Sequence, residues 1–137
     1  MRALLDTNVV LDVALERRPF HATANRIIRA SDFDRIHLFI TASMATDVYY
    51  ILRKSKGKEL TLAFLSDLLE SVDVCQVDRD VLLDALASGF NDFEDAVQNA
   101  AAVESEIEII VTRNKSDYRN SPLVVISPEE FVAAHLT

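Results

Sequence analysis

The sequence predicts an α/β protein, a three-layer α/β/α sandwich around a central parallel sheet of about five strands. Short apolar runs rich in β-branched residues, such as residues 107–112 (IEIIVT), alternate along the chain with longer segments of helical periodicity. The runs are continuously apolar and lack the period-two pattern of a sheet with one wet face. This is typical of parallel strands that are covered by helices on both sides.

The predicted elements follow one another with short connections. The strands are expected at residues 2–6, 36–41, 72–77, 107–112 and 123–126. Helices are expected at residues 9–18, 21–31, 43–56, 59–71, 78–88, 93–105 and from 127 onward, and residues 113–121 are expected to form a loop.

Helix boundaries are predicted from capping residues. Ser43 is a predicted N-cap, and Gly57 follows the basic end of the same helix. Asn91 and Glu94 have the spacing of a capping box, and Ser127 precedes a proline in the first turn of the last helix.

Composition limits the class of protein. With 137 residues, half of them apolar, and only 2 Gly and 3 Pro, the chain is expected to form a single domain over residues 1–137. It has no apolar run of the roughly 18–20 residues that cross a bilayer and no signal-peptide pattern. Cys75 is the single cysteine, so a cytoplasmic location is expected.

The charge balance is acidic, with 14 basic against 22 acidic residues and a formal net charge of −8. A broad basic face for nonspecific binding of nucleic acid is therefore not expected. An acidic excess most often serves solubility, but it also fits a cluster of carboxylates around a cation.

Four aspartates are expected at one edge of the sheet, because the carboxyl ends of parallel strands meet there. Asp6 ends the first strand, and Asp47 lies near the start of the helix after the second. Asp95 lies in the first turn of the helix that leads into the fourth strand, and Asp117 follows that strand. Each acid alone is an ordinary turn or cap residue, so the prediction depends on their joint placement.

Acids in one crevice repel one another. Two unit charges about 4 Å apart cost roughly 4 kcal/mol at an effective dielectric constant of 20. Either some of these carboxyls carry protons at neutral pH or a divalent cation neutralises them. Oxygen ligands suit Mg²⁺ or Mn²⁺, and no His or Cys pair has the spacing of a zinc site.

Four blocks of the sequence resemble the PIN-domain family of nucleases, which includes the VapC-type toxins of bacterial toxin–antitoxin pairs. They are LLDTNVVLD at the start, ITASMATDVYYILRK, DFEDAVQNAAA and IIVTRNKSDY, and together they span nearly the whole chain. The resemblance implies a PIN-like fold and metal-dependent hydrolysis of RNA, with products that carry a 5′-phosphate and a 3′-hydroxyl. It also implies a small antitoxin protein as partner, and exposed apolar area around Tyr49 and Tyr50 would suit an antitoxin helix or a homodimer.

The resemblance also implies roles for single residues. The catalytic and metal-binding acids would be Asp6, Asp47, Asp95 and Asp117. Residues that contact substrate or support the site would be Asn8, Asp92, Thr112, Arg113, Asn114 and Lys115. Arg113 and Lys115 flank the expected crevice and could hold phosphates, and Asp92 ranks above its neighbour Glu94.

The chain departs from the family pattern at two positions. Asp47 stands where many relatives have Glu, and Asn114 stands where others have Asp, which leaves open whether Asn114 or Asp117 meets the metal. A PIN-like module that only binds a partner therefore remains an alternative. A receiver or phosphotransfer domain built on an aspartate is a weaker one, because Asn8 stands where a phosphatase of that type has its second acid.

Overall fold

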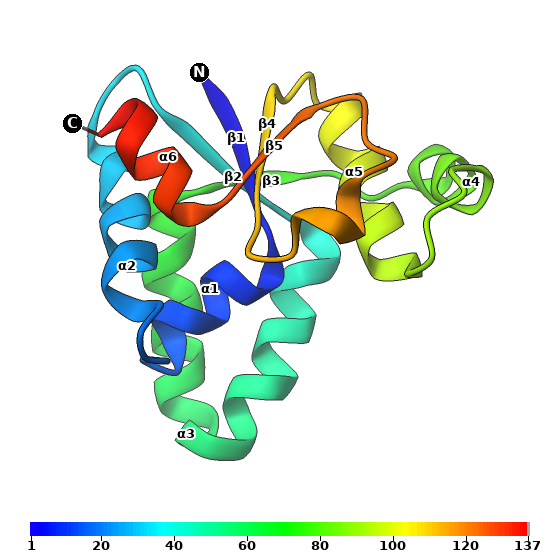
Figure 1. The fold of residues 1–137 in the computed structure, drawn as a ribbon. Coiled ribbons are helices and arrows are strands. Elements are labelled where there is room, and N and C mark those ends of the chain that lie inside the picture. The colour runs from blue at the N-terminus through cyan, green and yellow to red at the C-terminus, as the bar shows by residue number, and fades with distance from the viewer. Residues whose placement is uncertain (137) are drawn as a thin grey trace.

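The computed structural model describes residues 1–136, so Thr137, the last residue of the predicted domain, lies outside the described residues. Its strands are β1 (Arg2–Leu5), β2 (His37–Thr41), β3 (Asp73–Cys75), β4 (Ile109–Val111) and β5 (Val124–Ile126). They form one sheet in the order β3-β2-β1-β4-β5, and every neighbouring pair is parallel (Figure 1). The predicted parallel sheet of five strands is confirmed.

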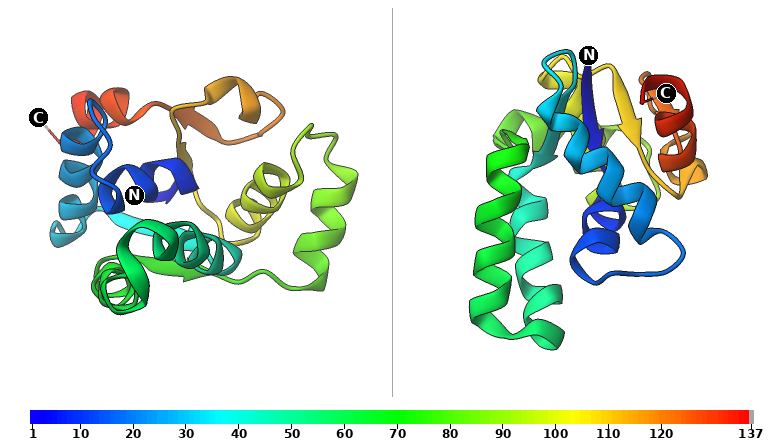
Figure 2. Two further views of the ribbon diagram at one scale, coloured as in Figure 1. Left: turned by 90° about the horizontal axis from the view of Figure 1, so that it is seen from below. Right: turned by 90° about the vertical axis from the view of Figure 1, so that its left-hand side faces the viewer.

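Helices cover both faces of this sheet. They are α1 (Thr7–Ala14), α2 (His21–Arg29), α3 (Ala42–Ser71), α4 (Arg79–Ala87), α5 (Phe93–Glu104) and α6 (Pro128–His135), with short 3₁₀ turns η1 (Ala30–Asp32) and η2 (Lys115–Tyr118). Helices α1, α2, α3 and α6 lie on one face, and α4 and α5 lie on the other (Figure 2). None of these helices combines the length and apolarity that spanning a bilayer requires.

Alternation along β1 divides the core in two. Leu5 belongs to the core that includes Val9 of α1, whereas Leu4 belongs to the core that includes Ala101 of α5. Successive side chains of a strand point to opposite faces, so a continuously apolar strand supplies both cores. The predicted three-layer α/β/α sandwich is therefore confirmed.

The two helices predicted at residues 43–56 and 59–71, on either side of Gly57, are confirmed. The two are arms of α3, and Gly57 lies between them with φ 79° and ψ 168°. The arms form a hairpin below the sheet in Figure 1. A positive φ is accessible to glycine because it has no Cβ, which explains why the chain turns at this residue.

Two predicted caps are wrong by one or two positions. Helix α3 is capped by Thr41, whose Oγ1 accepts a hydrogen bond from Met44 N at 3.2 Å, instead of by Ser43. Helix α5 is capped by Asp92, whose Oδ1 accepts from Asp95 N at 2.9 Å, so residue 91 lies outside the helix and the predicted capping box does not form. In both cases a polar side chain close to the predicted cap makes the bond.

Helix α1 begins two residues before its predicted start, because Asp6 itself is the N-cap. It also ends at Ala14, short of residue 18. The predicted start of the last helix is confirmed, since Ser127 and Glu130 form a capping box and Pro128 occupies the first turn. Part of the predicted loop 113–121 forms the turn η2.

Candidate metal centre

A hollow of about 330 Å³ lies at the carboxyl ends of β1 and β4. Helix α1, the start of α5 and the turn η2 are arranged around these strand ends, as the view from below in Figure 2 shows. The lining residues are Asp6, Thr7, Asn8, Leu11, Ile51, Asp92, Glu94, Asp95, Asn114 and Asp117. Six of the ten residues predicted for the site are among them.

Asp6 is the most buried acid of the hollow, with 4% of its surface exposed. Its Oδ1 accepts hydrogen bonds from Thr7 N at 2.8 Å and from the Tyr118 hydroxyl at 3.2 Å, and its Oδ2 accepts from Thr112 Oγ1 at 2.8 Å. Burial raises the pKa of Asp6 above its usual value, although these hydrogen bonds act in the opposite direction. The predicted supporting role of Thr112 corresponds to this bond.

Asp95 faces Asp6 from the first turn of α5. Burial raises the pKa of Asp95 to about 7, and the negative charges of Asp6, Asp92 and Asp117 contribute to the increase. Asp117, exposed on η2, also raises the pKa of Asp6. The acids from β1, α5 and η2 therefore interact electrostatically.

Glu94 occupies a place that the sequence did not assign. Its Oε1 accepts from Thr7 Oγ1 at 3.1 Å, and Gln98 Nε2 donates to the same Thr7 oxygen at 2.8 Å. Burial raises the pKa of Glu94, and the charge of Asp47 raises it further. Asp47 does not line the hollow itself. Its charge acts on Glu94, so Asp47 lies near the Glu94 side of the site.

The two basic residues predicted for phosphate binding make other contacts. Arg113 Nε and Nη2 donate to the carboxylate of the fully buried Asp12 at 2.8 and 3.2 Å, and its guanidinium lies 3.9 Å from the Phe20 ring centroid. Lys115 Nζ lies 2.7 Å from Glu130 Oε1. Neither residue lines the hollow.

The donor set fits a hard divalent cation. The acids that line the hollow have only oxygen donors, and within residues 1–136 none of them forms an ion pair with Lys, Arg or His. Buried carboxylates without a countercharge are costly, and a bound Mg²⁺ or Mn²⁺ would offset that cost. No three His, Cys, Asp or Glu side chains among the described residues already stand together at ligand spacing, so the acids border the hollow without converging on one point.

Sequence reasoning missed three polar residues that organise these acids. Thr7, Gln98 and Tyr118 hydrogen-bond to them, and all three are buried. Tyr118 directly follows Asp117, and Thr7 directly follows Asp6. Their position next to a predicted metal ligand is the sequence feature that could have identified them. Gln98 follows Glu94 by one helical turn and hydrogen-bonds to its carboxylate at 3.4 Å.

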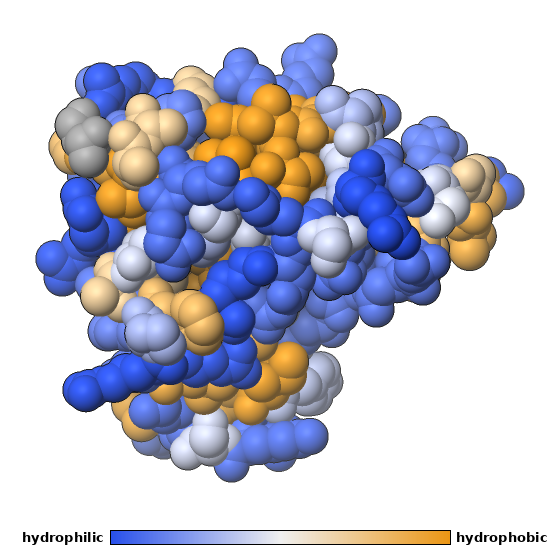
Figure 3. Space-filling model, in the orientation of Figure 1, coloured by the Kyte–Doolittle hydropathy of each residue, from blue (hydrophilic) through white to orange (hydrophobic). Residues whose placement is uncertain are grey.

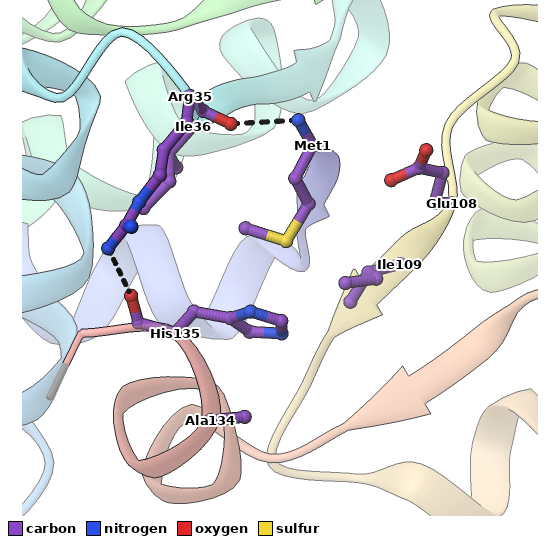
Figure 4. A pocket seen from close by; sticks show the side chains of 7 residues that line it. All are labelled: Met1, Arg35, Ile36, Glu108, Ile109, Ala134 and His135. Carbon is purple, nitrogen blue, oxygen red and sulfur yellow. Dashed lines mark hydrogen bonds between the residues drawn. The ribbon is translucent and has the colours of Figure 1, made fainter.

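A larger hollow of about 500 Å³ lies at the opposite, amino-terminal edge of the sheet. Figure 4 shows that the Met1 ammonium donates to Arg35 O and that Arg35 Nη2 donates to His135 O. Among the described residues, Glu108 is the single carboxylate that lines it. Size alone therefore does not identify the site, because the oxygen donors gather at the carboxyl edge.

The chain matches the PIN domain family over residues 2–116. It is 30% identical to Ribonuclease VapC1 of Aquifex aeolicus, in an alignment that covers 95% of this chain and 92% of that protein.

Two solved structures share the fold. VapBC2 from Rickettsia felis, bound to a DNA fragment from its promoter, has a TM-score of 0.72 at 15% identity and covers 93% of this chain and 98% of its own. A toxin–antitoxin complex from Klebsiella pneumoniae has a TM-score of 0.70 at 23% identity, with coverages of 92% and 97%. At these identities the two structures support the fold alone.

Asp95→Asn is expected to raise the thermal midpoint of the metal-free protein at pH 8 and to raise it less at pH 5. The pKa of Asp95 is about 7 in the folded protein against an ordinary value of 3.8, so the folded state resists ionisation and loses stability as pH rises from 4 toward 7. Calorimetry in EDTA measures both midpoints, and Asp84→Asn on the exposed side of α4 is the control. A midpoint difference that does not change with pH would contradict this view of Asp95.

Arg113→Met is expected to lower the free energy of unfolding by about 3 kcal/mol. The variant leaves the buried Asp12 carboxylate with the weaker of its two ion pairs, to Arg17 Nη1 at 3.7 Å. Urea unfolding measures the loss. Adding Asp12→Asn should restore part of it, since no buried charge then remains. Equal losses for Arg113→Met and for Arg119→Met, which removes an exposed cation, would show that the Asp12 pair contributes no stability.

Proposed function

This chain belongs to the PIN-domain family, and from that premise we propose that it is a divalent-metal-dependent ribonuclease and the toxin of a toxin–antitoxin pair. The observation that carries the proposal is the set of carboxylates from β1, α5 and η2 that border one hollow without a countercharge. The name of the Aquifex aeolicus relative, a ribonuclease, supports the same activity.

Asp6, Asp95 and Asp117 are the proposed metal ligands, because they border the hollow from three segments. Asp47 is the proposed fourth acid and acts from the side of Glu94, whose pKa its charge raises. We place Glu94 ahead of Asp92, because the Glu94 carboxylate is linked to the segment of Asp6 by the hydrogen bond from Thr7 Oγ1 at 3.1 Å. Asn8 and Asn114 line the same hollow as supporting amides.

The proposed reaction is hydrolysis of an RNA phosphodiester to a 5′-phosphate and a 3′-hydroxyl. A water oxygen bonds to phosphorus, the bond from phosphorus to O3′ breaks, and the leaving oxygen takes up a proton. Bound Mg²⁺ or Mn²⁺ would supply charge neutralisation and lower the pKa of water. The chain's part is to orient the acids: Thr7, Thr112 and Tyr118 hold Asp6 through both of its oxygens.

Substrate phosphates need cations, and Arg119 is the best placed. It lines a smaller hollow that shares Asp92, Asp95 and Asp117 with the candidate metal centre. Arg113 and Lys115 would contribute only after leaving Asp12 and Glu130. With so few cations near the acids, RNA affinity is expected to be weak and to fall only modestly with salt concentration, because the salt dependence grows with the number of phosphates that the protein neutralises.

The proposed partners are a small antitoxin and a second copy of the chain. Large apolar side chains are exposed on two helices: Tyr50, Ile51, Leu60 and Leu62 on α3, and Leu82, Leu83 and Leu86 on α4. Figure 3 shows apolar surface on the arms of α3 and at the outer end of α4. Exposed apolar surface of this kind suits a protein interface.

Asp6→Asn is expected to slow cleavage of RNA about 100-fold or more in Mn²⁺, because changing even an outer-shell group at a metal site costs about 10–100-fold. Purified ribosomal and transfer RNA serve as substrates, and end mapping identifies the products. EDTA should abolish cleavage by the wild type.

Asp67→Asn, on the exposed side of α3, is the matched control and should cleave like the wild type. Full Mn²⁺-dependent cleavage by Asp6→Asn would refute the proposed site. A wild type without any Mn²⁺-dependent rise in thermal midpoint would favour the module that only binds a partner.

A further inference from the structure

Tyr118 ends η2 with 1% of its surface exposed, and its hydroxyl lies at the junction of the acid network. The oxygen is 3.2 Å from Asp6 Oδ1, 3.2 Å from Asp95 Oδ1 and 3.1 Å from Gln98 Oε1. The ring packs edge-on against Phe90, with 6.0 Å between centroids. The phenol therefore joins the end of β1 to the first turn of α5.

One O–H group faces three acceptor oxygens. The amide of Gln98 is oriented by its other end, where Nε2 donates to Thr7 Oγ1 at 2.8 Å, so its oxygen points toward Tyr118. A phenol has a single proton to donate. The hydroxyl is thus a single donor that the two carboxylates and the Gln98 amide oxygen share, in a buried place where hydrogen bonds are hard to replace.

Asp6 and Asp95 have reason to move apart without that donor. Each raises the pKa of neighbouring groups through its charge, and neither has a basic partner among residues 1–136. Asp6 is fixed by three donors, whereas the Tyr118 hydroxyl is the one donor that reaches the Asp95 carboxylate within the described part of the chain. Tyr118 therefore controls Asp95 more than it controls Asp6.

We infer that Tyr118 is a positioning residue of the metal centre: its hydroxyl holds the Asp95 carboxylate toward Asp6, so that both acids are ordered before a cation binds. This inference rests on the proposed function. The hydroxyl does not bind the metal, and its contribution is to remove the cost of ordering Asp95 during binding. Groups that orient metal ligands in this way are worth about 10–100-fold in affinity or activity.

Tyr118→Phe tests the hydroxyl while keeping the ring and its packing on Phe90. Titration calorimetry of the metal-free full chain with Mn²⁺ is expected to show a dissociation constant about 10-fold higher than that of the wild type. In cleavage assays at fixed Mn²⁺, kcat should fall and KM for RNA should stay unchanged. Circular dichroism verifies that the variant is folded.

Tyr49→Phe is the matched control, because Tyr49 is half-buried on α3 and its hydroxyl hydrogen-bonds to none of the described site residues. It should bind Mn²⁺ like the wild type. A purely structural hydroxyl would lower the metal-free thermal midpoint of Tyr118→Phe and leave its Mn²⁺ affinity unchanged, which would overturn the inference and leave the ribonuclease proposal intact. A wild type that binds no Mn²⁺ would overturn both.

Discussion

A buried carboxylate without a countercharge is the constraint on which the carboxyl edge of the sheet depends. Asp6 directly follows β1 and is buried. Ionising its carboxyl is costly because little water reaches the group. The backbone N–H of Thr7 and the hydroxyls of Thr112 and Tyr118 offset part of that cost. The same carboxylate caps α1, so the start of the first helix and the floor of the hollow depend on one side chain.

The acids around Asp6 add repulsion that these hydrogen bonds do not remove. Asp95 and Glu94 have raised pKa values because of burial and because of their acidic neighbours. Arg113, which follows Thr112 after β4, donates to the buried Asp12 carboxylate of α1 instead of to these acids. Because Arg113 is engaged elsewhere, the acids of the hollow keep a negative potential for a divalent ion, at the expense of stability at this edge.

The layers and the placement of acids along one edge were predictable from the sequence, because apolar runs give parallel strands and parallel strands share one carboxyl edge. Asp6, Asp95 and Asp117 follow from that topology alone. The break at Gly57 was predictable too, because a glycine after the basic end of a helical segment is typical of a helix C-terminus. The bonds Arg113–Asp12 and Tyr118–Asp95 join residues that are 101 and 23 positions apart, and no local pattern encodes such side-chain contacts.

Anomalous diffraction from crystals soaked in Mn²⁺ tests most directly whether the carboxyl edge is a metal centre. A peak is expected in the hollow, at a Mn²⁺ ion that oxygens of Asp6 and Asp95 coordinate. Asp117 or Glu94 is expected to complete the protein ligands. Absence of a peak at saturating Mn²⁺, with the Asp6 and Asp95 carboxylates turned away from each other, would contradict it.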